Sequence, residues 1–163
     1  MKKILLLSLI TLTIAISGCK KDKKAVKDEP EVTSYEAIIE KRSIWHIYDN
    51  IHKYNNANNQ PVVNDSAHFA TRMGTKYVFK DEKLTVGTGS AAVIYNYSFS
   101  ISDGKNYIKI SKESNPAEEE TYQVLSADPT IMVWERPRTN ITYNNQAGLS
   151  GTHRIRFHCP CAE

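Results

Sequence analysis

Three cysteines and five histidines are the residues of this chain best suited to nucleophilic or metal chemistry. Two of the cysteines are separated only by a proline, in the C-terminal sequence Cys159-Pro160-Cys161. In an extended chain both thiols point to one face, which they share with His153. A local disulfide is the first candidate if the chain enters an oxidising compartment, and free or intermolecular thiols are the second. A metal site with His153 is the third candidate. The cysteines of zinc sites are usually separated by about two to four residues, and here a single proline separates them, so the spacing fits a zinc site poorly.

The rest of the sequence carries no recognisable catalytic motif. The histidines are scattered, and none belongs to an activation motif with a serine or a cysteine. No Gly-rich phosphate loop, nucleophile elbow or paired-metal signature is present. The run Glu118-Glu119-Glu120 is typical of a solvated surface. The sequence therefore predicts neither an enzyme nor a bound cofactor.

Aromatic residues are the strongest candidates for ligand binding. Between residues 92 and 101, aromatic and aliphatic side chains alternate with polar ones, as in a half-buried strand. Two interpretations are open: the rings line the mouth or interior of a β-barrel and contact a small apolar ligand, or they fill the barrel as its core. The candidate ligand-binding residues are Trp45, Tyr95, Tyr97, Phe99 and Trp134.

The N-terminus is typical of a secretory signal peptide. Two lysines precede an apolar run over residues 4–16, whose helical length of about 20 Å is too short for a hydrocarbon core of about 30 Å. The junction Ile16-Ser17-Gly18-Cys19 resembles the bacterial lipobox, in which two small residues precede an acylated cysteine. This resemblance implies that residues 1–18 are removed and that Cys19 anchors the protein in a membrane. In lipoproteins of enteric bacteria, the absence of Asp directly after the acylated cysteine favours the outer membrane. Lys20 stands at that position here, so we expect anchoring in the outer membrane, on its periplasmic or cell-surface face.

Charge divides the remaining chain into a tether and one domain. Residues 19–31 combine the cysteine with lysines and acids and contain almost nothing apolar, so we expect them to be a flexible tether. Residues 32–163 contain 14 Lys and Arg against 14 Asp and Glu. A neutral domain without a basic stripe argues against nucleic-acid binding. Its length suits a single domain.

Residue alternation predicts an all-β domain preceded by a short helix. The capping pattern Thr33-Ser34-Tyr35-Glu36 begins a helix over residues 34–42. Asp103-Gly104 supplies the positive φ angles of a two-residue hairpin, and Asp81-Glu82 separates another strand pair. An eight-stranded antiparallel barrel, or a sandwich, is expected. The predicted strands cover residues 44–54, 75–80, 84–88, 92–101, 106–111, 120–126, 130–136 and 152–158.

Two details of this pattern bear on function. In the first strand, strict alternation places Trp45, Ile47 and Ile51 on one face, opposite His52 and Tyr54. The Asn-rich stretches 55–73 and 139–151 are predicted to be long loops, which are usually functional or mobile.

Several segments resemble the lipocalin-like domains of Bacteroidetes lipoproteins. A lipoprotein signal, a short helix and a strand with one Trp match the opening of these domains. The hairpin over residues 76–86, the hairpin beginning at Asp103-Gly104 and the strand pair from Glu120 to Trp134 match later parts, so the resemblance covers most of residues 43–158. It implies a small barrel, sometimes with an internal cavity, that binds a small apolar or lipidic ligand. The alternative is a filled barrel that binds a protein partner, as an inhibitor, an immunity-type lipoprotein or an assembly subunit, through the two Asn-rich stretches.

Overall fold

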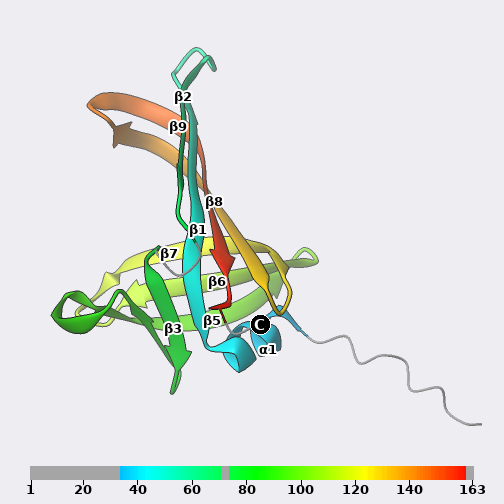
Figure 1. Ribbon diagram of the computed structural model, residues 1–163. Helices are drawn as coiled ribbons and strands as arrows, with labels where there is room; N and C mark the ends of the chain where they lie inside the picture. Colours follow the sequence, from blue (N-terminus) through cyan, green and yellow to red (C-terminus); the bar gives the residue numbers. More distant parts are fainter. Residues whose placement is uncertain (1–33, 71–73, 161–163) are drawn as a thin grey trace, which may run out of the picture. The chain divides into compact units, whose positions relative to one another are not determined.

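Antiparallel strands and one short α-helix make up most of the structure (Figure 1). The computed structural model describes residues 34–70 and 74–160. In chain order the elements are α1 (Tyr35–Arg42), β1 (Ile44–Asn55), β2 (Pro61–His68), β3 (Lys76–Lys80), β4 (Lys83–Val86), the 3₁₀ turn η1 (Gly89–Ala91), β5 (Val93–Ser102), β6 (Lys105–Lys112), β7 (Asn115–Ala127), β8 (Ile131–Tyr143) and β9 (Gln146–His158).

The strands form one sheet that closes on itself. Their order is β2-β1-β3-β4-β5-β6-β7-β8-β9, and an additional antiparallel pairing joins β1 to β9. This pairing runs from His46 opposite His158 to Asn55 opposite Ser150. Strands β1 and β3–β9 thus form a closed antiparallel barrel, which confirms the expected fold class. Strand β2 lies outside the ring and pairs with the second half of β1.

Aromatic side chains fill the barrel. Trp134 lies near the centre of the core, with ring centroids 4.8 Å from Phe157, 5.6 Å from Tyr122 and 6.0 Å from Tyr77. Trp45 is also completely buried. Burial of such large rings is the main source of stability expected for this domain.

Helix α1 packs against one end of this core. The helix lies where the sequence predicts, but its N-cap is one residue later than the capping pattern indicates: the Ser34 hydroxyl accepts a hydrogen bond from the Ala37 N–H at 3.2 Å. The buried side chain of Ile39 belongs to the core, and the Trp45 indole N–H donates to the Ile39 carbonyl at 3.1 Å. Among the described residues, no helix is long and apolar enough to span a membrane.

The Asn-rich stretches are not long loops, so that prediction was wrong. Strand β2 occupies residues 61–68, and β8 and β9 continue through the second stretch to a tight turn at Asn144 and Asn145. Both asparagines have positive φ, of 46° and 64°, as a type I′ hairpin turn requires. The polar composition arises because most side chains of β2, and many at this end of β8 and β9, are exposed.

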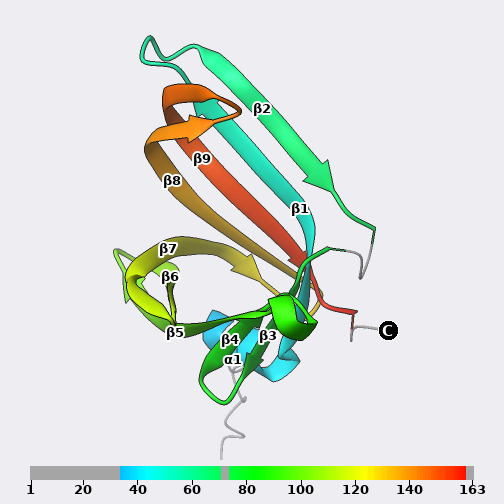
Figure 2. The same cartoon turned by 90° about the vertical axis from the view of Figure 1, so that its left-hand side faces the viewer.

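These segments form an arm that stands away from strands β3–β7 (Figure 2). We define the arm as residues 49–68 of β1 and β2 with residues 136–153 of β8 and β9. The arm exists because β7 and β8 pair only near their connecting turn, from Ala127 opposite Met132 to Gln123 opposite Glu135, and farther from the turn the two strands diverge. A second small core of Tyr54, Val63 and Leu149 stabilises it.

A β-bulge in β1 changes which side chains face inward. Ile47 pairs with Phe157 and Asp49 pairs with the adjacent residue Arg156. Two steps along β1 thus correspond to one step along β9, and Tyr48 is the additional residue. Beyond the bulge, His52 and Tyr54 therefore join the face that carries Trp45, and Ile51 lies on the outer face. The strict alternation predicted for this strand was wrong from Tyr48 onward.

The arm imposes a close backbone contact that predicts the effect of one substitution. A Cβ added at Gly151 would lie 2.0 Å from the carbonyl oxygen of Lys53, which is backbone and cannot rotate away. We expect Gly151→Ala to lower the free energy of unfolding by about 2 kcal/mol or more, measured by chemical denaturation. The variant Thr139→Ala changes an exposed side chain of β8 that makes no hydrogen bond with a described residue, and it should change this free energy by less than about 0.5 kcal/mol. Equal stability of the two variants would contradict this contact.

Candidate binding site beside helix α1

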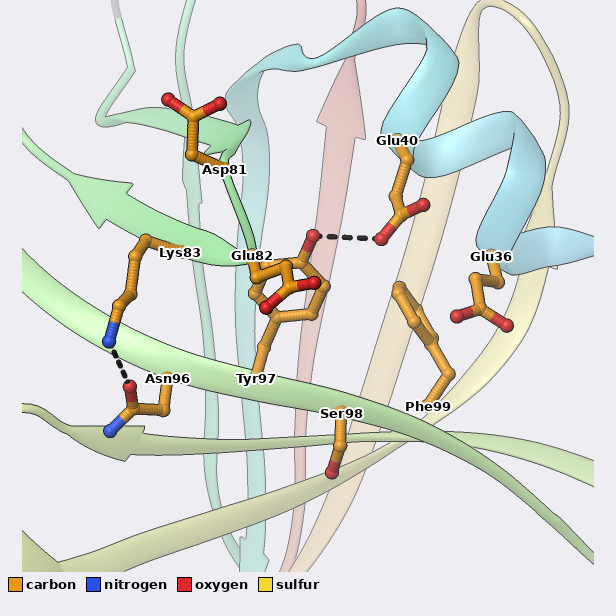
Figure 3. A pocket seen from close by; sticks show the side chains of 9 residues that line it. All are labelled: Glu36, Glu40, Asp81, Glu82, Lys83, Asn96, Tyr97, Ser98 and Phe99. Atoms are coloured by element: carbon orange, nitrogen blue, oxygen red, sulfur yellow. Dashed lines mark hydrogen bonds between the residues drawn. The ribbon is translucent and has the colours of Figure 1, made fainter.

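An open pocket of about 700 Å³ lies between α1, the β3–β4 turn and β5 (Figure 3). Its volume falls within the range of small-molecule sites, about 300–1,000 Å³. Carboxylates come from the helix and the turn, whereas β5 contributes aromatic, amide and hydroxyl groups. The lining residues are Glu36, Glu40, Asp81, Glu82, Lys83, Asn96, Tyr97, Ser98 and Phe99.

Local structure explains why four carboxylates converge at this pocket. Glu36 and Glu40 are about one helical turn apart, so they lie on the same side of α1. Asp81 and Glu82 occupy the two central positions of the β3–β4 hairpin, with φ angles of 51° and 59°. The type I′ geometry of this turn holds both acids between the two strands, at the edge of the pocket.

The one cation in the lining does not neutralise this rim. The Lys83 ammonium donates to the Asn96 amide oxygen at 2.6 Å and to the Glu113 carboxylate at 3.1 Å. Glu113 does not line the pocket, so the lysine charge is shared with an acid outside it. Asp81 lies 3.9 Å from the Lys80 ammonium, which partly balances its charge, so the excess of negative charge comes mainly from Glu36, Glu40 and Glu82.

Tyr97 joins the acidic rim to an aromatic floor. Its hydroxyl donates to the Glu40 carboxylate (Figure 3), at a distance of 2.8 Å. The centroid of its ring lies 5.2 Å from that of Phe79 and 5.7 Å from that of Phe99. Burial, the hydrogen bond to Glu40 and the nearby charges of Glu40, Glu36 and Glu82 raise the pKa of Tyr97. The tyrosine is therefore neutral and acts as a fixed donor to one carboxylate.

The structure separates the five aromatic candidates of the sequence into two groups. Trp45 and Trp134 are completely buried in the core. Tyr95, Tyr97 and Phe99 are partly buried and pack against that core, and only the last two line the pocket. The pocket therefore brings Tyr97 and Phe99 together, without the two tryptophans.

The cysteine candidates are only partly described. Cys159 is buried in the core, on the face predicted from alternation, whereas Cys19 and Cys161 lie outside the described residues. The disulfide between Cys159 and Cys161 and the lipidation of Cys19 therefore remain predictions. Within residues 34–70 and 74–160, no group of three or more His, Cys, Asp or Glu side chains has the arrangement of a metal site.

Sequence reasoning did not identify the acidic side chains of the pocket. Glu36 appears in the sequence as a capping residue, and Asp81-Glu82 as turn residues. The spacing of Glu36 and Glu40 indicates one helix face, but nothing in the sequence indicates that this face lies against the β3–β4 turn. Only the closed barrel brings these segments together.

Removal of the Tyr97 hydroxyl should have a pH-dependent effect on stability. At pH 7, Tyr97→Phe breaks the hydrogen bond to Glu40 and should lower the free energy of unfolding by about 1 kcal/mol. Because the folded pKa is raised, the hydroxyl contributes fully below the unfolded pKa of about 10, and its contribution is lost as the pH rises through the folded value. The difference between the two proteins, measured by denaturation from pH 7 to 11, should therefore shrink above pH 10.

A suitable control is Tyr107→Phe, because the Tyr107 hydroxyl makes no hydrogen bond to any described residue. This variant should match the original protein at pH 7. A difference for Tyr97→Phe that stays constant up to pH 11 would show that the hydroxyl is not protected in the folded state.

Comparisons with known proteins leave the pocket geometry as the main guide to function. No protein-family model, curated protein or solved structure matches the chain. The resemblance to lipocalin-like domains therefore remains a prediction from the sequence.

Proposed function

We propose that this chain is a membrane-anchored envelope lipoprotein whose lipocalin-like barrel binds a small ligand without catalysing a reaction. The pocket beside α1 is the ligand site, and its ligand combines an apolar group with a positive charge, as in an aromatic or alkyl amine. The observation that carries this proposal is the aromatic floor beneath a rim of four carboxylates, in a pocket of about 700 Å³.

The charge of the pocket selects among ligands. A neutral lipid would displace water from Glu36, Glu40 and the turn acids without replacing their hydrogen bonds, which is unfavourable. An ammonium group forms charge-assisted hydrogen bonds with such carboxylates and also favours the faces of aromatic rings. The proposed ligand is therefore an apolar molecule that bears a positively charged group.

Because the interior of the barrel is filled, a ligand site is expected at the end of the barrel and not inside it. Trp45 and Trp134 occupy the interior, and their side chains have no exposed surface for a ligand to contact. Tyr97 and Phe99 lie where the core meets the pocket, so they offer apolar surface without requiring the core to open.

Binding of matched probes tests the proposed ligand class. We expect phenethylamine to bind the full chain in detergent, measured by calorimetry, more tightly than the neutral 2-phenylethanol or the anionic 3-phenylpropionate. Glu36→Gln should weaken amine binding about fivefold or more, because it removes one rim charge. Glu119→Gln removes a carboxylate that does not line the pocket and should leave binding unchanged. Preference for the alcohol or the acid, or no amine binding, would refute the ligand class.

The membrane anchor is tested separately. In a bacterial host, an alkyne-tagged fatty acid should label the chain, and Cys19→Ser should abolish the label and release the protein from the membrane fraction. Cys159→Ser should leave the label in place. A labelled Cys19→Ser variant would rule out acylation at this residue.

The arm favours a second candidate function, protein–protein interaction. Within the part of the chain that the structure describes, β2 pairs only with β1, so its other edge presents backbone N–H and C=O groups. An extended segment of a partner can add to such an edge as a further strand. One dominant partner cross-linked through β2, together with no amine binding, would favour this function.

A further inference from the structure

The inner face of the arm carries a row of ionisable side chains across four strands. Arg136 of β8 pairs with His153 of β9, His153 pairs with His52 of β1, and His52 pairs with Asp65 of β2. The two imidazole rings stack, with centroids 4.4 Å apart and planes inclined by 14°. The row therefore brings two histidines together from opposite ends of the chain.

Both histidines are oriented by neighbouring polar groups. His153 Nε2 lies 2.6 Å from the Asn50 amide oxygen, and His52 Nδ1 lies 3.0 Å from the Tyr54 hydroxyl. The other ring nitrogens, Nδ1 of His153 and Nε2 of His52, take no part in these hydrogen bonds. One nitrogen of each ring is thus fixed by the protein, and the second is available to a ligand.

The carboxylates around this row are already bound. The Tyr143 hydroxyl donates to Asp65 at 2.6 Å. Glu120 of β7 accepts hydrogen bonds from Arg136 at 2.7 Å and from the Tyr122 hydroxyl at 2.8 Å. Glu120 is therefore paired with a cation, and one oxygen of Asp65 is occupied by a neutral donor.

Hydrogen-bond donors of the two arginines remain unsatisfied. Arg138 follows Arg136 by two residues on the same face, is half-buried, and forms no hydrogen bond or ion pair with residues 34–70 or 74–160. Arg136 Nε is buried and has no hydrogen-bond partner there either. A guanidinium group has five N–H donors, so beside the histidine pair Arg138 has donors to which no described protein group is an acceptor.

Burial and nearby charges keep both imidazoles neutral, and the charges of the two arginines act mainly on His153. Burial is the main cause that lowers the pKa of His153 to about 4, and His52, Arg136 and Arg138 lower it further, while Glu120 opposes them. Burial also lowers the pKa of His52, with Asp65 opposing and Arg138 adding to the shift. At neutral pH both rings are therefore uncharged donors or acceptors, with the two arginines of β8 on the His153 side of the pair and Asp65 on the His52 side.

We propose that the inner face of the arm binds an oxyanion, a carboxylate or phosphate group of a ligand, between Arg138 and the stacked pair of His52 and His153. Guanidinium groups bind both kinds of oxyanion through paired N–H donors. A metal ion is the competing occupant, since two imidazoles and a carboxylate lie in one row. The two arginines repel a cation, and no metal-site arrangement occurs in the described ranges. This site is separate from the acidic pocket and does not depend on it.

Anion titration of the full chain in detergent tests the proposal. Pyrophosphate and citrate are the probes, at constant ionic strength in sodium chloride, and the imidazole signals of His52 and His153 are followed by NMR. Saturable shifts with either probe are expected, and the tighter probe identifies phosphate or carboxylate as the preferred group. Shifts that match those in sodium chloride alone would overturn the proposal, as would saturable shifts with Zn²⁺ and none with the anions.

A pair of matched variants assigns the binding to this face. Arg138→Gln should weaken binding of the tighter probe at least tenfold, with the thermal unfolding midpoint almost unchanged, because Arg138 makes no hydrogen bond that the fold requires. Lys53→Gln removes the same charge from the outer face of β1, one residue from His52, and should leave the affinity unchanged. Equal losses in the two variants would indicate nonspecific attraction and refute the site.

Discussion

The pairing of β1 with β9 is the contact on which the rest of the structure depends. It joins segments from opposite ends of the domain, as the hydrogen bond between Asn50 and His153 illustrates, so its formation requires closure of a long loop. The same pairing closes the barrel and completes the core around Trp134. It also supplies the two central strands of the arm, because β2 attaches to β1 and β8 attaches to β9.

The fold separates charges that the composition balances. Residues 32–163 are neutral in total, yet the pocket beside α1 gathers four carboxylates with one lysine, and the inner face of the arm gathers two arginines whose neighbouring acids are already bound. A neutral total argues against a nucleic-acid surface, but it does not exclude local fields of opposite sign. Each field acts over short distances in salt, so we expect the two proposed sites to bind their ligands independently of each other.

Most of the fold follows from local sequence signals, whereas the sites do not. Asp103-Gly104 marks a hairpin because positive φ angles are needed at both turn positions, and the structure has them. The turn at Asp81-Glu82 is indicated only by the strand patterns on either side of it. The bulge at Tyr48 has no signal in a single sequence, since an inserted residue only shifts the alternation. That shift moves His52 to the inner face, so the row with His153 could not be predicted. Polar residues in β2 resemble a loop because an edge strand with little burial needs no apolar face.

In a barrel whose interior is filled, a ligand can bind only at the rims. The β3–β4 turn, on one rim, has an unfavourable backbone conformation that can be related to such a role. Both central residues of the exposed β5–β6 turn have positive φ, and one of them is Gly104, which tolerates that geometry. The β3–β4 turn has the same geometry but holds Asp81 and Glu82, for which a left-handed backbone costs on the order of 1 kcal/mol each. Glycine at the second position would relieve strain and remove a carboxylate from the pocket. The acidic pair is therefore better explained by its place on the pocket rim than by the stability of the hairpin.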